Sequence, residues 1–186
     1  MPQELSLSAT QPSRGMGFAL IFPMHKLRSS PLSIETMRRN LEATRSSWHN
    51  RCVACGRKNG NGLGLQFEVN ADGQVQASFA CQECFEGFPH ALHGGFVAVL
   101  LDAAMTNCLF AHGLVGMTGE LTVRFRRIVD IGKAARVRAW LECSSHRLHL
   151  LRANLEQEGE IRATASGKFL EIPAEERSKN HGGMNG

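Results

Sequence analysis

The stretch that decides the fold is ALHGGFVAVLLDAAM, residues 91–105, which has the composition of a buried helix with one acid in it. After two glycines, apolar residues cover every side of a helical projection except at Asp102. A helix that is apolar all round is buried in the core of a domain. The stretch therefore predicts a central helix over residues 94–111, ended by Gly113.

Asp102 is the unexpected residue in this helix, and two interpretations of it are open. A carboxylate is almost never fully buried without a partner, because burial costs free energy or raises the pKa. Asp102 either faces a surface groove or caps another element, or it faces a cleft and acts as a base or nucleophile.

His93, Gly94 and Gly95 stand at the predicted start of the same helix and favour the cleft. A helix N-terminus has free N–H groups and partial positive charge, and glycines let a ligand carbonyl approach the backbone closely. Gly94 and Gly95 are therefore candidate ligand-binding residues. Asp102 comes nine positions after His93, about 13 Å along the helix axis, so one chain does not bring both to one reacting atom. The spacing predicts a dimer with a shared site.

Apolar residues alternate with polar ones on both sides of the helix, which is typical of strands. A hairpin is expected over 65–79 with a turn at 70–73. Four more strands are expected after the helix, within 119–129, 134–143, 149–156 and 160–170. This order predicts an α+β fold in which a curved antiparallel β-sheet is wrapped around one long central helix.

The two ends of the chain lack such periodicity. Residues 1–49 are interpreted as a disordered tail and a short helix over 34–46 capped by Ser33, and 172–186 as a flexible tail. The apolar segment 15–24 contains a proline and is not read as a secretory signal; translation from Met24 or Met37 is an alternative.

Composition narrows the classes of function. No apolar run reaches the ~20 residues of a membrane span. The net charge of +4 slightly favours anionic ligands, but the basic residues are scattered and the chain has no Tyr and two Trp, which disfavours nucleic acid. Six cysteines without a signal peptide indicate a reducing, cytoplasmic location.

Four of the cysteines form two CxxC pairs, Cys52 with Cys55 and Cys81 with Cys84. Two such pairs form structural zinc sites, and the hairpin between them would bring its ends together. The 25 residues between the pairs exceed the usual spacing of about 15–20. Three interpretations of the two pairs remain open. They form a zinc site, or the first pair belongs to an ordinary loop and the second is a coincidence, or they form a redox dithiol. Cys108 and Cys143 are interpreted as packing residues.

The His-Gly-Gly sequence, followed by apolar residues and an Asp nine positions after the His, resembles the hot dog fold thioesterases. The most similar branch is the phenylacetyl-CoA thioesterase-like group of the 4-hydroxybenzoyl-CoA thioesterase superfamily. The resemblance extends over residues 50–171, although Ile128 stands where the family often has proline. It is carried by CVACGRKNGNGLGLQF (52–67), GFPHALHGGFVAVLLDAAM (87–105) and TGELTVRFRRIV (118–129).

The resemblance implies a role for each matching residue. The Gly94 N–H would bind the thioester carbonyl, and His93 would orient the site. Asp102 of the partner subunit would activate water or attack the carbonyl, and Thr118 would position the water or the acid. Several members have an Asn or Gln shortly before the His, whereas residues 86–90 contain none.

The resulting expectation is an acyl-CoA thioesterase that works as a homodimer or homotetramer and requires no cofactor for catalysis. The alternative is a non-catalytic acyl-CoA-binding or regulatory module on the same fold; a dehydratase or hydratase ranks last. A set of basic residues either forms a solvated sheet face or meets the phosphates of coenzyme A. It comprises Arg124, Arg126, Arg127, Lys133, Arg136 and Arg138.

Overall fold

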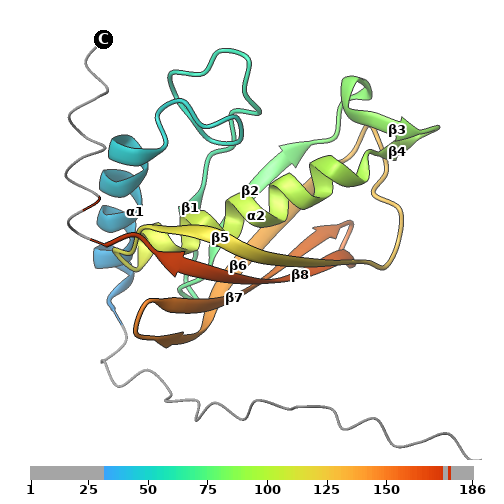
Figure 1. The fold of residues 1–186 in the computed structure, drawn as a ribbon. Helices are drawn as coiled ribbons and strands as arrows, with labels where there is room; N and C mark the ends of the chain where they lie inside the picture. Colours follow the sequence, from blue (N-terminus) through green and yellow to red (C-terminus); the bar gives the residue numbers. More distant parts are fainter. Residues whose placement is uncertain (1–31, 174–175, 177–186) are drawn as a thin grey trace, which may run out of the picture.

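A long helix lies against one face of a six-stranded antiparallel sheet in the computed structural model (Figure 1). The structure describes residues 32–173 and 176, so the interpretations of the segments 1–31 and 177–186 lie outside the described residues. The helix is α2, Gly94–Ala111. The sheet order is β1-β2-β6-β7-β8-β5, with bounds Glu68–Val69, Val75–Ala80, Ala134–Ser145, Leu148–Gln157, Glu160–Glu171 and Gly116–Phe125. The predicted α+β layers and antiparallel pairing are confirmed.

The bounds of α2 match the prediction because both ends carry local signals. The His93 side chain caps the first turn by accepting a hydrogen bond from the Gly95 N–H, and Gly113 follows the helix with φ +74°. Leu100 and Leu101 have no exposed surface, and neither do Ala104 and Met105 one turn further along the helix. By length and composition α2 is apolar enough to cross a membrane, but 67% of it is buried inside the fold, as in the core helix of a globular domain.

Strands β6, β7 and β8 alternate buried and exposed residues, and their buried sides face α2. Strand β5 differs, because most of its ten residues are exposed. It lies at the end of the sheet order with β8 as its single neighbour among the described strands. A long exposed edge strand of this kind presents unpaired backbone groups along one side.

The hairpin predicted over 65–79 is present as β1 and β2, with Gly73 at φ +73° in the turn. Its first strand is shorter than predicted. A helical turn η1 (Glu83–Phe85) and a small hairpin, β3 (Glu86–Phe88) with β4 (Ala91–Leu92), were not predicted.

Helix α1, Ile34–Trp48, packs beside the C-terminal half of α2 through Met37 and Leu41 (Figure 1). Ser33 caps α1 as predicted, accepting a hydrogen bond from the Thr36 N–H. α1 positions the loop that follows it, which continues over α2.

Candidate active site

Asp102 lies half-buried on the side of α2 that faces β5. The Thr118 hydroxyl, three residues into β5, donates a hydrogen bond of 2.7 Å to Asp102 Oδ1. The two residues implied to act together are therefore in contact. Burial raises the pKa of Asp102, and the hydrogen bond from Thr118 partly opposes this by favouring the charged form.

Asp102 opens into a cavity of about 310 Å³ between α2 and the loop after α1. Among the described residues that line the cavity, Asp102 is the only acid. Its lining is otherwise mainly apolar: His49, Cys52, Val53, Ala54, Ala98, Val99, Ala103, Thr106 and Leu121. A cavity of this kind accepts an apolar group and keeps a carboxylate at its wall poorly solvated.

The start of α2 forms a second polar site, with His93, Gly94 and Gly95 all exposed. The Gly95 N–H is bound by His93 Nδ1 at 2.9 Å, so it is not free for a ligand in this conformation. The Gly94 N–H has no hydrogen-bond partner among the described residues. The Phe125 ring covers Gly94, since a Cβ atom added there would lie 3.5 Å from it. Of these two glycines, Gly94 is therefore the one whose N–H is available to a ligand.

The two polar sites are separate within one chain. Gly94 and Asp102 are eight residues apart on one continuous helix, about 12 Å along its axis. A single thioester carbon cannot contact both groups of the same chain.

The helical turn η1 and the β3–β4 hairpin together position His93, and sequence reasoning missed this support. The His93 N–H donates to the Phe85 carbonyl at 2.9 Å, and a Cβ atom on Gly87 would lie 2.9 Å from His93 Cα. Position 87 therefore accepts only glycine without displacing His93. The signal in the sequence was Gly87 itself, within the segment 86–90 that lacks an amide side chain.

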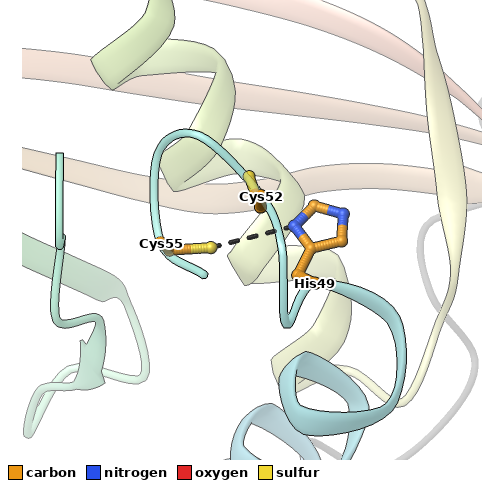
Figure 2. A group of neighbouring side chains, drawn as sticks. All are labelled: His49, Cys52 and Cys55. Carbon is orange, nitrogen blue, oxygen red and sulfur yellow. Dashed lines mark hydrogen bonds between the residues drawn. The ribbon is translucent and has the colours of Figure 1, made fainter. Parts of the chain in front are cut away.

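The first cysteine pair has a neighbour that sequence reasoning also missed. A ring nitrogen of His49 and the sulfur atoms of Cys52 and Cys55 lie within 4.8 Å of one another. Figure 2 shows the three side chains gathered in this loop. The Cys55 thiol lowers the pKa of Cys52 by donating to its sulfur, with His49 adding to the effect. The HNRCVAC sequence, residues 49–55, carried the signal, because its His and two Cys recur every three residues.

The second pair is not part of this group within the described residues. Cys81 is buried and lies 3.9 Å from the Phe79 carbonyl, and burial raises its pKa to about 11. Cys84 is exposed and lies 3.8 Å from the Gln82 side chain. The structure thus does not assemble the four cysteines considered as a zinc site.

Five of the six basic residues fall into two groups, and the sixth, Arg136, lines another cavity beside Gln66 and Gln76. Several form ion pairs: Arg127 with Glu160, Lys133 with Asp130 and Glu158, and Arg138 with Glu156. Arg124 and Arg126 line a separate cavity of about 450 Å³ together with Arg152. The ion pairs agree with a solvated sheet face, and the two arginines at the cavity remain available for an anionic ligand.

Comparisons with known proteins show that this chain is similar to thioesterases. A family model described as thioesterase superfamily matches residues 90–163. Acyl-coenzyme A thioesterase THEM4 of Bos taurus is 26% identical over 123 residues, which are 63% of this chain and 51% of that protein. The match thus spans about half the length of that relative.

Solved structures share the fold. The PaaI protein from the phenylacetic acid degradation operon of E. coli has a TM-score of 0.62 at 17% identity, covering 75% of this chain and 95% of that one. A hypothetical thioesterase of Streptococcus pneumoniae, solved with coenzyme A, has a TM-score of 0.55 at 14% identity, covering 58% and 88%. The hot dog fold that the resemblance implies is confirmed, and residues 90–163 match the thioesterase superfamily model.

Proposed function

We propose that this protein hydrolyses an acyl-CoA thioester to a free acid and coenzyme A. The observation that carries the proposal is Asp102, a carboxylate with a raised pKa at the wall of a mainly apolar cavity, held by Thr118. The superfamily match and the acyl-CoA thioesterase relative support the same reaction class.

In the proposed mechanism Asp102 takes a proton from a water molecule, whose oxygen attacks the thioester carbon. The carbonyl π electrons move to oxygen, and the Gly94 N–H of the other subunit donates to the resulting oxyanion. When the tetrahedral intermediate collapses, the C–S bond breaks and the thiolate of coenzyme A leaves, to be protonated by Asp102 or by water. A variant of this route, in which Asp102 itself attacks the carbon and water then hydrolyses the anhydride, uses the same residues. Neither route requires a cofactor.

The proposed enzyme is a homodimer, alone or paired into a homotetramer, with each site shared between two subunits. The separation of Gly94 and Asp102 within one chain supports this, because a second copy supplies the missing half. The exposed β5 carries Met117 and Phe125, which are 68% and 57% exposed, and offers an apolar edge for a second copy. Six free cysteines support the proposed cytoplasmic location.

A non-catalytic acyl-CoA-binding module is the second candidate. It is favoured by the segment 86–90, which lacks the amide side chain that several members of the family have before the histidine. Such a module would bind the same ligands and release no thiol.

The test is the release of free thiol from short, medium, long and aryl acyl-CoA substrates by wild type, Asp102→Asn and a control, Asp72→Asn. Asp72 lies exposed in the β1–β2 turn, so its change alters charge away from the cavity. We expect Asp102→Asn to lower kcat/KM by about 10²–10⁴, the range for a lost general base, with Asp72→Asn unchanged. Equal background rates in all three proteins, with acyl-CoA still bound, would establish the binding module instead.

A further inference from the structure

The loop after α1 gathers three metal-binding side chains in one place. His49 ends α1, and residues 49–56 turn back so that Cys55 Sγ lies 3.8 Å from His49 Nδ1 (Figure 2). Zinc–sulfur bonds of ~2.3 Å and zinc–nitrogen bonds of ~2.0–2.1 Å place these two atoms about 3.6 Å apart in a tetrahedral site. This pair therefore needs to move by only a few tenths of an ångström to hold an ion, and the Cys52 sulfur lies within 4.8 Å of both partners.

The backbone of this loop is arranged around the sulfur atoms. Gly56 closes the turn with its N–H on the Cys52 carbonyl at 2.9 Å, and any Cβ atom there would lie 2.5 Å from the Cys52 nitrogen. This tight turn keeps Cys52 and Cys55 close together, the arrangement in which two thiolates share a tetrahedral ion.

Side chains from α2 complete the surroundings. Asn107 is fully buried, and its amide nitrogen lies 3.6 Å from Cys55 Sγ. The His49 ring packs edge-on against Phe110 at a centroid distance of 4.7 Å, which fixes its orientation. Ligands whose rotamers are held in this way lose little freedom when an ion binds.

The group opens towards the proposed active site, since His49 and Cys52 line the same cavity as Asp102. Among the described residues, no fourth His, Cys, Asp or Glu joins the three within 4.8 Å. Three protein ligands with an open fourth position are the arrangement of catalytic rather than structural zinc.

We propose that His49, Cys52 and Cys55 bind one thiophilic divalent ion, Zn²⁺, whose fourth position is open to the cavity that contains Asp102. The two thiolates and one imidazole select zinc over magnesium or calcium, which prefer oxygen ligands. The inference goes beyond the proposed function and does not depend on it, because ion binding requires only the loop and α2.

The first experiment measures zinc per chain in protein purified under reducing conditions without chelator. We expect about one zinc per chain in wild type and near zero in His49→Ala, Cys52→Ser and Cys55→Ser. Cys81→Ser and Cys84→Ser are the matched controls and should keep their zinc. Loss of zinc from these controls as well would overturn the proposal in favour of a four-cysteine site.

A second measurement keeps the proposal testable if the ligand variants fail to fold. Metal-free wild type is titrated with Co²⁺, and we expect thiolate-to-cobalt charge transfer and the visible bands of a tetrahedral ion. Absence of these bands, with Cys52 instead alkylated rapidly or joined to Cys55 in a disulfide, would overturn metal binding.

The open position is tested on the Co²⁺ form with azide, a small anion that enters the cavity. A shift of the visible bands on addition of azide supports an exchangeable fourth ligand, whereas an unchanged spectrum overturns the open position. None of these readouts requires thioester hydrolysis, so an inactive protein that binds zinc would refute the proposed function alone.

Discussion

At the scale of single residues, the pair of Asp102 and Thr118 determines the pH dependence that the proposed mechanism should show. A general base works when it is unprotonated, so kcat/KM should rise with pH through the pKa of Asp102. Burial moves that pKa upward, and the donated hydrogen bond of Thr118 moves it down. Removing the hydroxyl therefore moves the acidic limb of the profile to higher pH.

We predict this displacement for Thr118→Val, measured as kcat/KM against pH for an acyl-CoA substrate. Thr122→Val is the control, since Thr122 lies on the same strand and lines the separate cavity beside Arg124. If the kcat/KM profiles of Thr118→Val and wild type have the same acidic limb, Asp102 is not the group that titrates.

The same pKa shift has a consequence for stability. An acid whose folded-state pKa is raised binds its proton more tightly in the folded protein than in the unfolded chain. Stability is then lost as pH rises from the unfolded-state pKa through the folded-state pKa, and the ionised carboxylate destabilises the fold at neutral pH.

We therefore predict that Asp102→Asn raises the melting temperature at about pH 8, and that the gain shrinks towards about pH 5. Thermal unfolding followed by circular dichroism at both pH values measures this. A variant less stable than wild type at the higher pH would mean that ionised Asp102 stabilises the protein.

At the scale of elements, α2 could be predicted because it is apolar on every side, and the four long strands could be predicted because their apolar and polar residues alternate. The β3–β4 hairpin was missed because its strands are two or three residues long and held by backbone contacts from distant segments, such as Leu92 N–H to the Val129 carbonyl. Such contacts leave no local pattern. The second cysteine pair lies beside this hairpin, which explains why spacing alone did not predict its position.

The residues of the candidate active site were also predicted only in part. Asp102 and Thr118 were placed together through the resemblance, and the structure has them in contact. Gly95 was expected to bind a ligand, but the capping interaction with His93 occupies its N–H. His49 was missed because its spacing from the cysteine pair does not show that the loop turns back, and only the fold of the loop brings it to the cysteines.

The first turn of α2 provides a sharp test of the proposed oxyanion donor. Gly94 is the first residue of the helix, where proline is tolerated, and the preceding His93 has the extended conformation that proline requires (φ −58°, ψ 132°). Gly94→Pro therefore removes the N–H with little disturbance of the helix start.

We predict that Gly94→Pro lowers kcat by about 10²–10³, the effect of losing one oxyanion donor, whereas Gly94→Ala stays within a few-fold of wild type. The alanine variant keeps the N–H, and its Cβ makes an ordinary contact with the Phe125 ring at 3.5 Å. Steady-state kinetics of the two variants provide the comparison. Equal losses in both would indicate a steric effect instead of a lost donor.

At the scale of the whole molecule, the central claim is that each active site is formed by two subunits. In the described part of the chain, the N-terminus of α2 and the Asp102 carboxylate are too far apart to act on the same carbon, and β5 is an exposed edge strand. In a two-fold symmetric dimer both sites have the same composition, Gly94 from one subunit and Asp102 from its partner.

The measurement that tests this claim most directly mixes two inactive variants, Gly94→Pro and Asp102→Asn, and follows acyl-CoA hydrolysis after their subunits exchange. Random exchange makes half of the dimers hybrid, and each hybrid has one intact site of two, so the mixture should regain about a quarter of wild-type activity. Each variant alone, subjected to the same exchange, should remain inactive. A mixture that stays inactive while hybrid dimers are shown to form would contradict the shared site.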